Sequence, residues 1–177
     1  IVTNSSLDTE TTMAMKVIDY CLLSAPGAPL KQALIDAGIG KDILGGYDSS
    51  ICQTTFSIIT KNTDESKKHE FVKIIKEVLE DVVENGIENK SLEAAINSME
   101  FRYREADFGS FPKGLMYGID LLTTWLYDDE KPFDAIGVEI YELLKDKIGT
   151  DYYTDLIKKY LLDNNHASLV ILEANPG

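Results

Sequence analysis

Residues 64–85 carry a continuous apolar stripe at helical spacing. This period predicts one long helix with a single apolar face. Gly86 can end that helix, because glycine readily adopts the left-handed conformation that is common just after a helix. A helix of this kind must bury its stripe, so the chain has to supply a second layer of secondary structure. The stripe consists of Phe71, Ile74, Ile75, Val78, Leu79, Val82 and Val83.

Four segments of strand type could supply that layer. Residues 51–59 alternate, with the larger apolar side chains on one face, which is typical of a half-buried antiparallel strand. Residues 1–3 have the character of a strand end, and the glycine-containing residues 43–47 of an irregular strand. Residues 167–173 are apolar on both faces, so we expect a central strand there.

Further helices are predicted between the strands. In the one that Pro112 can open, Leu115, Ile119, Leu122 and Trp125 share a face. Strands at both ends of the chain with helices between them predict an α+β fold, in which an antiparallel-rich sheet is covered on one face by helices. The predicted helices run over about 8–22, 30–37, 91–106, 112–125, 133–148 and 151–162.

Charge and hydropathy argue against two classes of partner. The chain carries 30 acidic and 17 basic residues, a formal net charge of −13. Such a composition does not favour the clustered cationic face that nucleic acid phosphates require. No apolar run approaches the ~20 residues that a membrane-spanning helix needs. We therefore expect neither nucleic acid nor a membrane as a partner.

Cys21 and Cys52 are the two cysteines, too few for a disulfide scaffold. Both fall on apolar faces, so we interpret both as small buried side chains of a protein in a reducing compartment. The thiols and a lysine-rich, arginine-poor composition favour a cytoplasmic location. The chain also begins at Ile1 without an initiator methionine or a signal-like segment, which is typical of a piece cut from a longer polypeptide.

The sequence contains no recognisable catalytic or metal-binding motif. Zinc sites usually place at least two ligands close in sequence, whereas His69 and His166 are far apart. HxxEH, HExxH and the GxSxG turn of serine hydrolases are all missing. We therefore expect no catalytic and no metal-binding residue, and interpret both histidines as solvated or turn-capping. A small hydrolase that uses one of them is a remote alternative.

Residues 43–47, Ile-Leu-Gly-Gly-Tyr, have the clearest functional claim. Two glycines remove side chains from an extended backbone, so another chain could lie against it and add a strand. The alternative is a β-bulge at a sheet edge, in which the glycines serve the fold alone. Taken by themselves, the residues favour the bulge.

Several segments together resemble the second domain of presequence proteases, which are insulinase-like zinc metallopeptidases with the inverted HxxEH motif. The resemblance begins in residues 22–40 and continues through Phe101-Arg-Tyr-Arg-Glu-Ala-Asp-Phe108, residues 112–117 and residues 160–166. Each segment is weakly specific alone, but they occur in order over nearly the whole chain. The resemblance implies a single noncatalytic peptidase domain, residues 1–177, from the first half of a longer chain.

This resemblance implies an activity for the parent protein. In that family, paired α+β halves close around a peptide, and only the first domain carries HxxEH and a downstream Glu ligand. The parent would be a zinc metalloendopeptidase that degrades unstructured peptides, with its zinc bound outside this segment. The fragment alone would be inactive, and its partners would be the catalytic domain of the same chain and the peptide substrate.

The resemblance also implies a role for the glycine segment. In insulinase-like members, a strand of the second domain holds the N-terminal end of the substrate, and residues 43–46 match that strand by position. An alternative of a different class is a stand-alone scaffold or peptide-binding module that keeps the fold without the enzyme. The substrate-binding residues that the resemblance implies are Gly27, Ile43, Leu44, Gly45, Gly46 and Tyr47.

Overall fold

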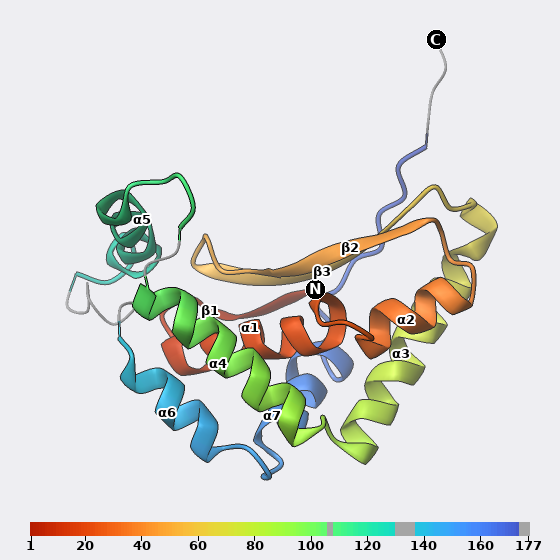
Figure 1. Cartoon of the computed structure of the whole chain (residues 1–177). Helices are drawn as coiled ribbons and strands as arrows, with labels where there is room; N and C mark the ends of the chain where they lie inside the picture. The colour runs from red at the N-terminus through yellow and green to blue at the C-terminus, as the bar shows by residue number, and fades with distance from the viewer. Residues whose placement is uncertain (106–107, 130–136, 174–177) are drawn as a thin grey trace.

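The computed structural model describes residues 1–105, 108–129 and 137–173. A three-stranded antiparallel sheet forms one layer, and most of the helices lie below one of its faces (Figure 1). The predicted α+β class is therefore confirmed. The strands are β1 (Val2–Ser5), β2 (Asp42–Asp48) and β3 (Gln53–Lys61). The α-helices are α1 (Thr9–Asp19), α2 (Pro29–Asp36), α3 (Lys68–Asn85), α4 (Asn89–Glu105), α5 (Lys113–Trp125), α6 (Glu139–Asp146) and α7 (Tyr152–Ile157), joined by the π-helical turns η1 (Tyr20–Ser24) and η3 (Lys158–Leu162) and the 3₁₀ turn η2 (Glu65–Lys67).

The sheet has β3 in its centre, with the strand order β1-β3-β2. β2 and β3 pair in an unbroken register that runs from Asp42 opposite Lys61 to Asp48 opposite Thr55. The segment 43–47 is therefore continuously paired, and the β-bulge alternative is wrong for β2, although Gly45 and Gly46 both adopt positive φ. The register shift of this sheet lies between β1 and β3 instead.

α1 is the central helix of the layer below the sheet. It contacts β1, β2, α4, α6 and α7. Four of its apolar side chains, Ala14, Met15, Val17 and Ile18, are completely buried. Full burial of a large aliphatic side chain contributes about 1.5–3 kcal/mol to folding, so α1 fixes the sheet to the other helices.

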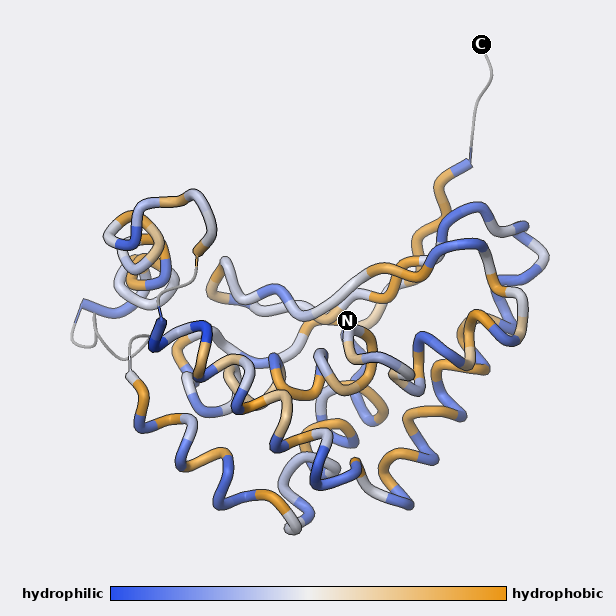
Figure 2. Tube along the Cα trace, in the orientation of Figure 1, coloured by the Kyte–Doolittle hydropathy of each residue, from blue (hydrophilic) through white to orange (hydrophobic). Residues whose placement is uncertain are grey.

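The helix expected at residues 64–85 is confirmed as η2 followed by α3. The Asp64 carboxylate accepts a hydrogen bond from the backbone N–H of Ser66 and so caps the start. Phe71 and Leu79 are buried, whereas Val72, which lies off the stripe, is exposed. Figure 2 shows hydrophobic and hydrophilic residues alternating along α3, as a helix with one buried face requires.

α5 stands apart from the other helices, beside the sheet (Figure 1). The prediction that Leu115, Ile119, Leu122 and Trp125 share a face is confirmed by the helical bounds. That face points away from the core, however, because the exposed fractions of these side chains lie between 44% and 53%. Apolar spacing identified the helix but not the side on which it is covered.

Residues 167–173 do not form the central strand that the sequence predicts. The chain pairs with the sheet only as far as His166, whose carbonyl oxygen accepts a hydrogen bond from the Val2 N–H at 2.9 Å. Beyond it, Val170 and Leu172 are 73% and 94% exposed. A strand that is apolar on both faces needs cover on both faces, and no element in the described ranges supplies it.

Candidate functional site

β2 lies at an edge of the sheet, and its register determines which backbone groups face outward. The Phe56 N–H donates to the Ile1 carbonyl oxygen at 2.8 Å, and the Ile1 amino group donates to the Phe56 carbonyl oxygen at 3.0 Å. The polar backbone groups of Phe56 therefore face β1. Tyr47, which lies opposite Phe56, must form a non-hydrogen-bonded pair with it and turn its own N–H and C=O away from β3.

Alternation along the strand extends this result. In an antiparallel ladder every second residue faces the neighbouring strand. Leu44 and Gly46 therefore direct their backbone groups toward β3, whereas Ile43, Gly45 and Tyr47 direct theirs toward the outer edge of β2, the side turned away from β3. Within the implied segment 43–47, the backbone groups of these three residues thus point toward the outer edge.

Asp19 closes one end of this outer edge. It is the last residue of α1, and the Tyr47 N–H donates a hydrogen bond to its carboxylate. Burial raises the pKa of Asp19 to about 6, and the hydrogen bond from Tyr47 partly offsets that shift. In the described part of the chain, no partner is seen for the outward backbone groups of Ile43 and Gly45. Ile43 is itself only 2% exposed, whereas Gly45 is exposed, so the accessible part of this edge is centred on Gly45.

The two glycines are explained by contacts inside the domain. Gly45 has φ +131°, and a Cβ there would clash with the Ser57 carbonyl oxygen on β3. Gly46 has φ +145°, and a Cβ there would lie 3.2 Å from Asp19 Oδ2. Both positions therefore need glycine to let β3 and α1 approach β2, whether or not a peptide binds.

Gly27 lies elsewhere, in the turn between η1 and α2. Its φ of +73° belongs to the left-handed region, which favours glycine because it lacks a Cβ. A Cβ at this position would meet no atom within 4 Å. The turn conformation alone therefore accounts for this glycine.

The side chains beside the free edge are partly apolar. Leu44 lies opposite Ile59, and both are exposed, at 40% and 47%. A strand added to β2 could place an apolar side chain next to Leu44, where cross-strand pairs of this type stabilise sheets. The exposed carboxylates of Asp42 and Asp48 lie at the two ends of β2.

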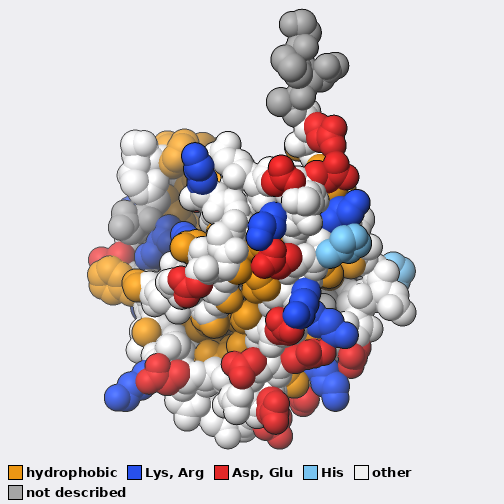
Figure 3. All heavy atoms as spheres, turned by 90° about the vertical axis from the view of Figure 1, so that its right-hand side faces the viewer, with side chains coloured by type: hydrophobic (Ala, Val, Ile, Leu, Met, Phe, Trp, Pro, Cys, Tyr) orange, Lys and Arg blue, Asp and Glu red, His pale blue; other side chains and the backbone are white. Residues whose placement is uncertain are grey.

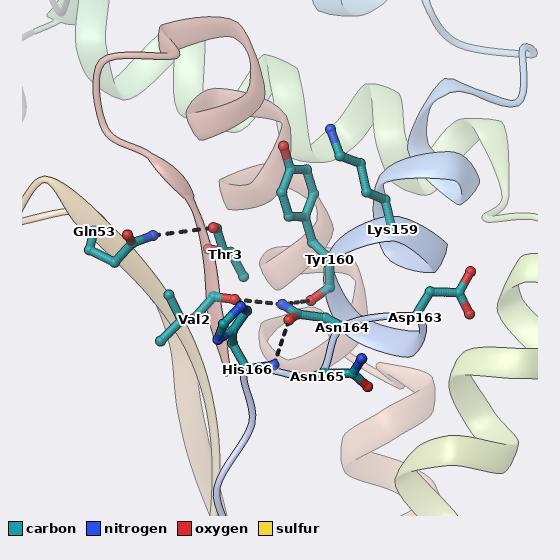
Figure 4. A pocket seen from close by; sticks show the side chains of 9 residues that line it. All are labelled: Val2, Thr3, Gln53, Lys159, Tyr160, Asp163, Asn164, Asn165 and His166. Carbon is teal, nitrogen blue, oxygen red and sulfur yellow. Dashed lines mark hydrogen bonds between the residues drawn. The ribbon is translucent and has the colours of Figure 1, made fainter.

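The opposite edge of the sheet is closed by the segment that follows η3. Asn164 Nδ2 donates to the Val2 carbonyl oxygen at 2.6 Å and to the Tyr160 carbonyl oxygen at 2.9 Å. Asn164 Oδ1 accepts from the backbone N–H of His166 at 2.8 Å. Figure 4 shows these contacts in a shallow pocket, whose polar groups hold the C-terminal segment against β1. This edge leaves no room for a second chain at Val2.

The structure does not place the two histidines in a common site. His69 is exposed at the start of α3, and His166 belongs to the turn that closes β1. No group of three His, Cys, Asp or Glu side chains in the described ranges could hold a metal ion, so these residues do not fit zinc. Nor does any described helix have the length and apolar character of a membrane span.

The cysteines differ from each other. Cys21 is buried, as expected, and burial raises the pKa of its thiol to about 11. Cys52 is only half-buried, with its Sγ 3.7 Å from Ser5 Oγ, so the expectation of a buried side chain is wrong there. It lies just before β3 begins, where the alternating pattern no longer determines burial.

Charged groups are mixed on the surface. Figure 3 shows acidic side chains lying among basic and apolar ones on the face turned toward the viewer, not in one continuous acidic field.

Asp19 was not found by sequence reasoning. The signal that could have found it is an acidic residue directly between apolar positions, Ile18 and Cys21, of a helix that is otherwise buried.

Comparisons with known proteins agree with this fold. The family model described as the Peptidase M16 inactive domain matches residues 2–99. Protein HypA of Clostridium perfringens is 40% identical over 176 residues, which cover 99% of this chain and 18% of that protein. Presequence protease 1, chloroplastic/mitochondrial, of Arabidopsis thaliana is 29% identical over 182 residues, covering 99% of this chain and 17% of that protein.

A solved structure shows the same architecture. An M16-like peptidase from Alicyclobacillus acidocaldarius superposes with a TM-score of 0.62 at 17% identity, covering 92% of this chain and 36% of that one. The chain spans less than a fifth of the length of the two curated relatives. The fold, the family match over residues 2–99 and the relatives together show that this chain belongs to the M16 peptidase family, as a domain of its noncatalytic type.

Proposed function

We propose that this chain is a noncatalytic domain of a zinc metalloendopeptidase that degrades unstructured peptides. It forms part of the wall of the substrate chamber and holds an extended peptide along the outer edge of β2. Membership of the M16 family supports the peptidase context. In this proposal another part of the parent protein binds the zinc ion, as the family resemblance implies, and no group of ligands suited to a metal ion is found among the described residues.

The observation that carries the proposal is the asymmetry between the two sheet edges. At β1, Asn164 and His166 occupy the outward backbone groups of Val2. At β2, the alternation of the ladder turns the N–H and C=O of Gly45 outward at an exposed position, whereas Ile43, which also faces outward, is buried. An extended peptide can pair with such an edge by main-chain hydrogen bonds, which are largely independent of its sequence. This suits a peptidase that accepts varied unstructured substrates.

In this proposal, the residues of this chain bind and orient the substrate, whereas the chemistry takes place elsewhere. Gly45 fixes the peptide backbone, and Leu44 contacts one of its side chains on the open face of the sheet. Asp19 limits the length of the paired segment, because it occupies the Tyr47 N–H. The zinc in the parent protein would activate the water that attacks the peptide bond.

Backbone amide exchange measured by NMR tests the binding edge directly. An unstructured basic peptide should slow the exchange of the Gly45 amide, whereas the amide of the buried Ile43 should already exchange slowly in the free protein. The amides of Leu44 and Gly46 should change little, because they already bond to β3. Protection spread evenly over β2, or confined to another surface, would contradict the proposal.

A control on the peptide avoids disturbing the protein. Replacement of Gly45 is unsuitable, since a side chain there clashes with Ser57. Peptides that carry N-methyl groups at alternate residues are better probes. Methylation of the residues that face β2 should abolish binding, whereas methylation of the intervening residues should leave it intact; equal loss in both series would exclude strand addition.

The peptidase context has its own test. The mass of the native gene product should be several times the 19.7 kDa of this chain, and the product should contain zinc. A mass near 19.7 kDa would favour the alternative of a stand-alone scaffold or peptide-binding module of the same fold.

A further inference from the structure

The outward side of α5 is a continuous apolar surface, which we name the α5 face. Its residues recur at intervals of three and four, so they form one stripe along the helix. All of them are between 44% and 69% exposed. An exposed stripe of this size marks an interaction site more often than a chance surface feature. The α5 face consists of Leu115, Ile119, Leu122, Trp125 and Leu126.

The inward side of α5 is already held against the domain. Tyr117 Oη donates to the Tyr103 carbonyl oxygen on α4 at 3.2 Å, and its ring meets the rings of Tyr103 and Phe108 edge-on. Ser6 Oγ donates to the Thr123 carbonyl oxygen at 3.1 Å. These contacts fix the rotation of α5 about its own axis, and the α5 face therefore points away from the domain.

Charge separates the α5 face from the rest of the surface. α5 contains two charged groups, Lys113 and Asp120. Asp120 is turned inward, where burial raises the pKa of its carboxyl group and the Lys16 ammonium lowers it. The outward stripe itself is uncharged, in a chain whose formal net charge is −13.

We propose that the α5 face is the docking surface for a neighbouring domain of the same polypeptide, which meets it with apolar side chains. The inference rests on the proposed function, since it requires this domain to be part of a longer chain. Relatives that are about six times as long contain a matching segment. In a parent protein of that length, other domains of the same polypeptide would lie close to the α5 face. Tethering gives such a neighbour a high effective concentration, so a patch of modest size is sufficient.

A second copy of this domain is a poorer occupant. Two such domains, each carrying −13, would repel each other on approach. A linked neighbour can differ in charge and is held nearby in any case. The two occupants also predict different cross-linked products.

Photo-cross-linking in the native gene product tests the proposal. A benzoylphenylalanine residue would replace Leu122, and a control would replace Lys76, which lies exposed on α3. After irradiation, mass spectrometry should find cross-links from position 122 to residues outside this 177-residue segment, without an increase in intact mass. The yield at position 122 should exceed that at position 76 by about tenfold.

Three other outcomes would overturn the proposal. Doubling of the intact mass would identify a second copy as the occupant. Cross-links only to α4, α6 or other parts of this domain would show that α5 folds back on its own body. Equal yields from both positions would show no docking at all. Zinc content and intact mass of the same sample reveal separately whether the peptidase context itself has failed.

Discussion

Glu100 on α4 accepts a hydrogen bond from Lys145 on α6, with 2.7 Å between Oε2 and Nζ. Its other oxygen accepts from Arg104 Nε, also at 2.7 Å. These two hydrogen bonds lower the pKa of the Glu100 carboxyl group. The Glu100 carboxylate thus binds Arg104 within α4 and also connects α4 to α6 through Lys145, which lies 45 residues away in the sequence.

Replacement of Glu100 by alanine should destabilise the fold. The change removes both hydrogen bonds and leaves Lys145 without its main partner on α4. We expect the melting temperature at pH 7 to fall by about 2–4 °C, given that roughly 1 kcal/mol moves Tm by that amount in a chain of this size. Circular dichroism would measure it. Glu93→Ala, at an exposed position of the same helix, should leave Tm within 1–2 °C of its original value, roughly the effect of a surface change.

Asp19 should make the stability of the fold depend on pH. Its pKa is raised from 3.8 to about 6 in the folded protein, so between these values the folded state binds more protons than the unfolded state. Stability from this group therefore increases as the pH falls from about 6 to about 4. Asp19→Asn should raise the stability at pH 7.5 and lose this advantage near pH 4.

Urea unfolding at both pH values would measure that effect. Glu84→Gln, at an exposed position on α3, is the matched control and should change little at either pH. An Asp19→Asn variant that is less stable than the original at pH 7.5 would show that the Tyr47 hydrogen bond outweighs the burial of the charge.

The two thiols should differ in reactivity. Cys21 is buried and its pKa is raised to about 11, so little thiolate forms and reagents cannot reach it. Cys52 is half-buried and should react in the folded protein. Titration with a chromogenic disulfide reagent should detect one thiol natively and two in denaturant. In a Cys52→Ser variant, a fast native reaction would show that Cys21 is accessible.

The glycines at 45 and 27 should tolerate alanine unequally. Gly45→Ala meets both an unfavourable φ and the Ser57 carbonyl oxygen, so it should destabilise the hairpin by roughly 2–4 kcal/mol. Gly27→Ala has open space around it and should cost about 1 kcal/mol, the usual penalty of the left-handed conformation. Equilibrium unfolding compares the two, and equal losses would contradict the packing described for β2 and β3.

Elements with a one-sided pattern could be predicted from the sequence. The stripe of Phe71 and Leu79 and the alternation that includes Phe56 each match a single buried face, and the structure buries these residues. The strand at 43–47 was also expected, although its unbroken pairing with β3 was not. In these cases local periodicity and tertiary burial coincide.

Apolar segments without a covered face could not be placed correctly. Leu122 and Leu172 have the composition of buried residues, yet both are exposed here. Periodicity shows that a face is apolar but not which surface covers it. Asp19 was missed for a related reason, because its effect on β2 depends on a contact between residues that are 28 positions apart.

The packing around Gly45 changes how related sequences should be compared. Since β3 requires a glycine at this position, purifying selection on folding alone would preserve it in paralogues that have lost every ligand. The glycine pair is therefore a marker of an intact hairpin. Gain or loss of peptide affinity during the divergence of the family should instead be traced at positions 19 and 44, whose side chains β3 does not constrain in this way.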